Sequence, residues 1–172
     1  MRVWSLCLGL IMLVAITPSS LAGKGAPAAD MPATALSEVG RPAVDLSPAV
    51  LATKPQTELA VSYLTSKGEY HGTFRGVLLW TLLVDGGLVG APDPHGALRR
   101  SVVVTGKDGY AVVFGMGEIA PELGAKPILL ATALDGRSLP ADGNMRLVVA
   151  GDKHGARSVR DVVSIAVRSL DP

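Results

Sequence analysis

Three cations and a histidine gather in one short segment near the C-terminal end of the chain. Residues 151–160 read Gly-Asp-Lys-His-Gly-Ala-Arg-Ser-Val-Arg and contain Lys153, His154, Arg157 and Arg160. Glycine lets backbone N–H groups approach an anion closely, and arginine offers a planar fork of donors that matches phosphate oxygens. The segment therefore indicates an anion-binding loop. The alternative is a solvated basic turn between two strands.

No other group of residues forms a recognisable catalytic or metal motif. The histidines are His71, His95 and His154, so no two of them lie at the short spacing of a zinc-ligand pair. The sequence lacks a Gly-x-Ser-x-Gly nucleophile motif and a Gly-x-Gly-x-x-Gly nucleotide motif. We therefore expect no protein-built metal site and no serine hydrolase chemistry.

The composition excludes several further classes of protein. The 172 residues include 16 Lys and Arg against 15 Asp and Glu, so there is no basic footprint for nucleic acid. A hydrophobic fraction of 48% is too high for a disordered chain. The single cysteine, Cys7, excludes an internal disulfide framework.

The first 22 residues have the pattern of a secretory signal peptide. Arg2 precedes an apolar run over residues 3–16, and small residues at 20 and 22 fit a cleavage site. The run is shorter than the ~18 residues that a spanning helix needs, although an uncleaved anchor is the alternative. We therefore expect an exported protein, periplasmic or secreted, with no stable membrane span after cleavage. Cleavage would remove Cys7 and leave a chain without cysteine.

The remaining chain divides into two parts by composition. Residues 23–55 are rich in Ala and Pro and contain no aromatic residue, which predicts a linker or loosely packed arm, with a helical turn over 43–52. Residues 56–172 predict an α+β domain of mixed β-sheets with short helices. The expected strands are 59–64, 70–74, 101–105, 110–114, 127–131, 145–149 and 162–167. The expected helices are 78–84 and 118–123, with a helical turn beginning over 156–161.

Four stretches of this second part, in order, are similar to motifs of one family. They are residues 74–83, 105–110, 128–140 and 146–160. The last contains Arg-Leu-Val-Val-Ala-Gly and then Gly-Ala-Arg-Ser-Val-Arg, similar to Arg-Leu-Val-Val-Pro-Gly and Gly-Ala-Arg-x-Val-Lys. In this order the motifs resemble the oxidoreductase molybdopterin-binding domain, the central domain of the sulfite oxidase family.

The resemblance implies a sulfite oxidase molybdopterin-binding-domain-like fold and a cofactor site. In that family the last motif contacts a pterin dithiolene cofactor, which implies cofactor contacts from Arg157 and Arg160. Lys153 and His154 are further candidates, and Tyr110 would lie near the pocket. Arg160 stands where the family usually has Lys, which keeps the charge but changes the donor geometry.

One departure from the family concerns the metal. Family enzymes hold molybdenum with a cysteine thiolate, and no cysteine follows residue 7 in this chain. The first functional hypothesis is an exported redox protein that binds a molybdopterin-type cofactor, alone or with a redox or other periplasmic protein partner that supplies missing ligands. The alternative is a cofactor-free binding or scaffold module that retains the fold.

These two hypotheses make different spatial predictions. Convergence of Tyr110, Lys153, Arg157 and Arg160 on one concave pocket would favour cofactor binding. Scattering over a flat surface, or filling of the pocket by Trp80 or by residues 23–55, would favour the scaffold.

Overall fold

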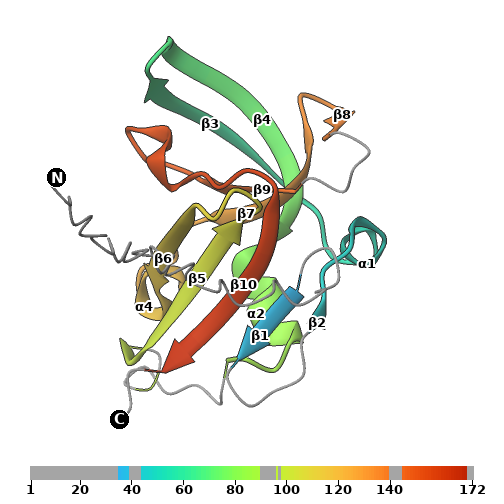
Figure 1. Ribbon diagram of the computed structural model, residues 1–172, viewed down its shortest axis with the longest axis vertical. Helices are drawn as coiled ribbons and strands as arrows, with labels where there is room; N and C mark the ends of the chain where they lie inside the picture. The colour runs from blue at the N-terminus through green and yellow to red at the C-terminus, as the bar shows by residue number, and fades with distance from the viewer. Residues whose placement is uncertain (1–34, 39–43, 90–95, 97, 140–144, 170–172) are drawn as a thin grey trace, which may run out of the picture.

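Two β-sheets pack against each other over a shared apolar core in the computed structural model (Figure 1). The structure describes residues 35–38, 44–89, 96, 98–139 and 145–169. The first sheet has the order β2-β1-β10-β5-β6, and the second has the order β3-β4-β7-β8 with β9 also paired to β7. All the strand pairs except β1 with β10 are antiparallel. The architecture is consistent with the predicted α+β class.

The bounds of the elements follow the chain. The first sheet consists of β1 (Ala35–Glu38), β2 (Val44–Asp45), β5 (Arg100–Gly106), β6 (Ala111–Gly115) and β10 (Val162–Ser169). The second consists of β3 (Thr57–Thr65), β4 (Gly68–Leu78), β7 (Ile128–Leu134), β8 (Arg137–Ser138) and β9 (Arg146–Val149). The helical elements are α1 (Pro48–Ala52), α2 (Leu79–Asp85), α4 (Met116–Ile119) and the 3-10 turn η1 (Gly155–Arg157).

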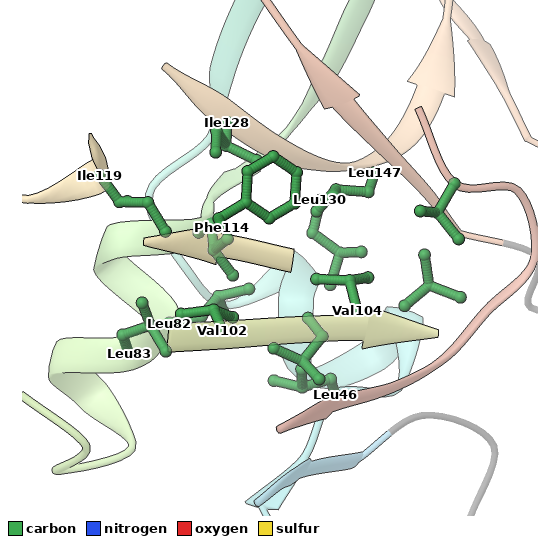
Figure 2. Close-up of a cluster of buried hydrophobic side chains, with 14 of the residues drawn as sticks. Leu46, Leu82, Leu83, Val102, Val104, Phe114, Ile119, Ile128, Leu130 and Leu147 are labelled. Carbon is green, nitrogen blue, oxygen red and sulfur yellow. The ribbon is translucent and has the colours of Figure 1, made fainter. Parts of the chain in front are cut away.

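Strand β7 explains how the core is divided. Its first four residues are all buried, and their side chains alternate between the two faces of the second sheet. Ile128 and Leu130 join the larger cluster between the sheets, together with Val102, Phe114 and other apolar side chains. Figure 2 shows these side chains pointing toward one another. Residues 129 and 131 face a smaller cluster that contains Tyr63 and Phe74.

Most of the predicted elements are confirmed. The β-branched runs around the turn at residues 106–109 form the β5–β6 hairpin, and the left-handed conformation that closes this turn is taken by Gly109. The expected helix at 78–84 is α2. The expected helix at 118–123 is reduced to the single turn α4, and the turn expected from 156 is the short η1.

The described part of residues 23–55 differs from the loosely packed arm that its composition predicted. Strand β1 pairs in parallel with β10, so this part of the chain extends the first sheet. Leu46 and Leu51 are buried in the core between the sheets. Two leucines thus bury apolar surface in a segment that has no aromatic residue. The backbone N–H and C=O groups of β1 pair with β10, a strand distant in sequence.

The long β3–β4 hairpin is held to β7 at a point that requires glycine. A side chain at Gly76 would collide with the backbone of Leu130 and Ala131 on β7, so a larger residue cannot keep this strand pairing. The hairpin projects at one end of the molecule (Figure 1), and its tip lies beside the segment that follows β9, where Leu64 bridges to His154. This placement creates the candidate site. In the described part of the chain, no helix has both the length and the hydropathy of a membrane span.

Candidate functional site

An open pocket of about 640 Å³ lies between the β3–β4 hairpin and the segment of residues 151–160, which we call the 151–160 loop. The side chains that give the pocket its chemistry are Tyr63, Tyr70, Arg146, His154, Ser158 and Arg160. We call it the tyrosine–arginine pocket. Among the described residues that line it there is no Asp or Glu, so within this part of the chain two arginines and a histidine face the space without a carboxylate.

Two tyrosines form an aromatic wall of the pocket. Tyr63 and Tyr70 face each other across the β3–β4 ladder, and their rings stack at a centroid distance of 5.1 Å with an interplanar angle of 25°. Gly155 of the loop lies against the Tyr63 ring so closely that an added Cβ would come within 2.6 Å of it. The absence of a side chain at 155 therefore brings the loop backbone onto the aromatic wall.

Arg146 is a pocket residue that sequence reasoning did not single out. It begins β9, and its guanidinium lies over the Phe74 ring at 5.6 Å from the centroid. Burial raises the pKa of Tyr70, and the neighbouring Arg146 partly opposes this shift. The Tyr70 phenol is therefore neutral at pH 7, and it hydrogen-bonds with the Arg146 side chain.

His154 and Arg160 were predicted site residues, and both line the pocket. His154 is exposed and forms a parallel β-bridge with Leu64, which places the loop beside the end of β3. The adjacent Lys153 carbonyl accepts a hydrogen bond from the Leu64 N–H at 2.9 Å. Lys153 itself has an exposed side chain and is not among the pocket-lining residues.

Arg157, which the resemblance implied as a cofactor contact together with Arg160, is bound to carboxylates. Its Nε and Nη2 donate to the two oxygens of Asp152 at 2.8 and 2.7 Å, and its Nη1 donates to Glu118 at 2.8 Å. The guanidinium also lies 5.3 Å from the centroid of the Phe114 ring. These hydrogen bonds, first to Asp152 and then to Glu118, raise the pKa of Arg157 above its ordinary value.

Asp152 joins Arg157 to a second cation. Its Oδ1 lies 2.9 Å from Nζ of Lys126, and its side chain is only 14% exposed. The hydrogen bonds from Arg157 lower the pKa of Asp152, more than its partial burial raises it, and Lys126 adds to the effect. Glu118, Lys126, Asp152 and Arg157 form what we call the carboxylate network.

Tyr110 lies near the loop, as the resemblance implied, but it does not line the pocket. Its hydroxyl donates to the backbone carbonyl of Ala156 at 2.5 Å. Of the five predicted site residues, the structure thus places His154 and Arg160 in the pocket. Tyr110 and Arg157 hold the loop, and Lys153 faces solvent. Neither Trp80 nor the described residues before 56 line the pocket.

The chemistry of the pocket suits one kind of ligand. An aromatic wall favours a planar ring, and the arginines beside it favour a phosphate or similar anion. The donors do not suit a metal ion, because imidazole is the only good metal ligand among them. Across the described residues as a whole, no three His, Cys, Asp or Glu side chains are grouped to hold a metal.

The fold is similar to that of several solved structures. Among them is the sulfane dehydrogenase SoxCD from Paracoccus pantotrophus, with a TM-score of 0.61 and 15% sequence identity. The match covers 81% of this chain and 39% of that longer chain. At this identity the likeness concerns the fold alone. No family model matches the sequence, and no curated protein matches it.

Proposed function

We propose that this protein binds a phosphate-bearing pterin of the molybdopterin type in the tyrosine–arginine pocket. The observation that supports this function is the placement of stacked Tyr63 and Tyr70 beside Arg146 and Arg160, with no carboxylate among the described residues that line the pocket. The aromatic wall would contact the pterin, and the two guanidiniums would hold its phosphate. The fold shared with part of a sulfane dehydrogenase, which is an oxidoreductase by name, adds support.

The proposal concerns the organic part of the cofactor. A molybdopterin-type cofactor supplies redox chemistry through the metal on its dithiolene sulfurs. This chain offers that metal no thiolate apart from Cys7, which lies in the expected signal peptide. We therefore propose cofactor binding without the usual oxygen-atom transfer, unless a redox or other periplasmic partner protein contributes the missing ligand.

A direct test uses the full chain produced with its own N-terminus and purified from the exported fraction. Neopterin monophosphate serves as the probe, because pterin fluorescence reports stacking on an aromatic side chain. We expect saturable binding that Arg160→Ala weakens about ten- to a hundredfold, the range for losing a hydrogen bond to a charged group. Arg168→Ala is the matched control, since Arg168 is exposed on β10 and does not line the pocket.

Two further measurements on the same preparation complete the test. Acid extraction and oxidation should release a fluorescent pterin in near-equal amount to protein, and the intact mass should show removal of residues 1–22. Failure of the wild type to bind the probe, together with no extractable pterin, would contradict the proposal. That result would favour the cofactor-free scaffold, which the engagement of Arg157 by carboxylates also fits.

A further inference from the structure

The 151–160 loop is fastened to the first sheet and its helix by side chains that do not line the pocket. The Tyr110 hydroxyl, at the start of β6, donates to the Ala156 carbonyl at 2.5 Å. Arg157 is hydrogen-bonded to Asp152 within the loop and to Glu118 on α4. Both attachments lie within three residues of η1, the turn that connects the two halves of the loop.

The same loop supplies three of the six side chains named above as giving the pocket its chemistry: His154, Ser158 and Arg160. These residues can bind a ligand tightly only if the loop is already ordered, because otherwise binding must oppose the conformational entropy of the segment. An attachment that fixes the backbone between 152 and 158 therefore lowers the entropic cost of binding without touching the ligand.

We infer that Arg157 and Tyr110 are positioning residues: they hold the 151–160 loop against α4 and β6 so that His154 and Arg160 face the pocket. This inference rests on the proposed function. In this role Arg157 does not attract the ligand, because its positive charge is already matched by Asp152 and Glu118.

Neutralising Glu118 distinguishes a ligand-contact role of Arg157 from a positioning role, because the two roles predict opposite changes in ligand affinity. If Arg157 contacted the anionic ligand, Glu118→Gln would free its guanidinium and remove a competing negative charge, and the affinity would rise. If Arg157 positions the loop, the same substitution loosens the loop and the affinity falls. We expect a loss of about two- to tenfold, the range for one hydrogen bond.

The experiment measures neopterin monophosphate affinity and amide hydrogen exchange of residues 151–160 in the full chain. Glu118→Gln and Tyr110→Phe should each weaken binding and accelerate exchange in the loop while leaving exchange in β5 and β10 unchanged. Arg157→Lys keeps the charge but not the fork, so its losses should be smaller than those of Arg157→Met. The control is Glu122→Gln. Glu122 is an exposed carboxylate between α4 and β7, and its substitution should change neither the affinity nor the exchange of the loop.

The outcomes are distinguishable from those of the proposed function. Tighter binding by Glu118→Gln, or unchanged loop exchange in all these variants, would overturn the positioning role. If the wild type does not bind the probe, the proposed function fails. Exchange in the free protein would then still decide whether Arg157 and Tyr110 hold the loop.

Discussion

The basic side chains of the 151–160 loop divide into two sets with different neighbours. His154 and Arg160 face a pocket with no carboxylate among its described lining residues. Arg157 lies three residues from both and is bound to two carboxylates at 2.7–2.8 Å. Within the described part of the chain no carboxylate is paired with the first set, whereas the charge of Arg157 is matched inside the protein. A cluster of cations in a sequence therefore predicts an anion site only after its internal partners are known.

The largest expected difference between the two sets is in the free energy of unfolding. Arg157→Met should lower the free energy of unfolding by about 2 kcal/mol, because it leaves Asp152 and Glu118 without their shared donor. Arg160→Met, at an exposed site, should change it by less than about 0.5 kcal/mol. Urea unfolding of both variants checks the prediction, and equal destabilisation by the two substitutions would show that the loop has only one kind of cation.

The pH dependence of the carboxylate network gives a smaller effect with a defined sign. Because the Arg157 hydrogen bonds lower the pKa of Asp152 from its ordinary value of 3.8, the ionised carboxylate stabilises the fold at pH values above 3.8. That stabilisation is lost as the pH falls through the lowered pKa. Asp152→Asn should therefore cost about 1 kcal/mol at pH 7, and the difference from wild type should shrink on acidification below 3.8.

Unfolding in urea over a series of pH values measures this difference. Glu122→Gln is a suitable comparison, because an exposed carboxylate should show no such dependence. A wild-type advantage over Asp152→Asn that stayed constant into acid would contradict the role assigned to the ionised carboxylate.

The smallest expected effect concerns Lys153, which belongs to neither set. Its side chain is exposed and outside the pocket, so Lys153→Ala should change neopterin monophosphate affinity by less than about twofold. Titration at two salt concentrations would detect a long-range contribution. A tenfold loss would place Lys153 with Arg160 as a ligand contact.

Local sequence patterns were sufficient for the strands and helices that are stabilised by near neighbours. The valine runs of β5 and β6 and the turn between them predict their own pairing. Strand β1 could not be predicted in this way, because its four residues form a strand only by pairing with β10 at the other end of the chain. The burial of Leu46 and Leu51 depends on the same distant contact.

The site was likewise predictable only where its residues lie close together in sequence. The loop glycines and cations identified His154 and Arg160, but the partner of Arg157 on α4 is 39 residues away in sequence. The tyrosine wall was missed although a signal existed. Tyr63 and Tyr70 each lie three residues from the two-residue turn at 66–67, which places them opposite each other. The turn expected over 66–68 is one residue longer and would have paired Tyr63 with His71 instead.

The aromatic residues divide the molecule into regions that can be observed separately by spectroscopy. The chain has three tyrosines, and Tyr63, Tyr70 and Tyr110 all belong to the pocket or to the attachment of its loop. Of its two tryptophans, Trp4 lies in the expected signal peptide and Trp80 packs against the core between the sheets. In the processed protein, tyrosine absorbance would therefore follow the loop and tryptophan fluorescence the core. Loosening of the loop could be distinguished from global unfolding without attaching a label.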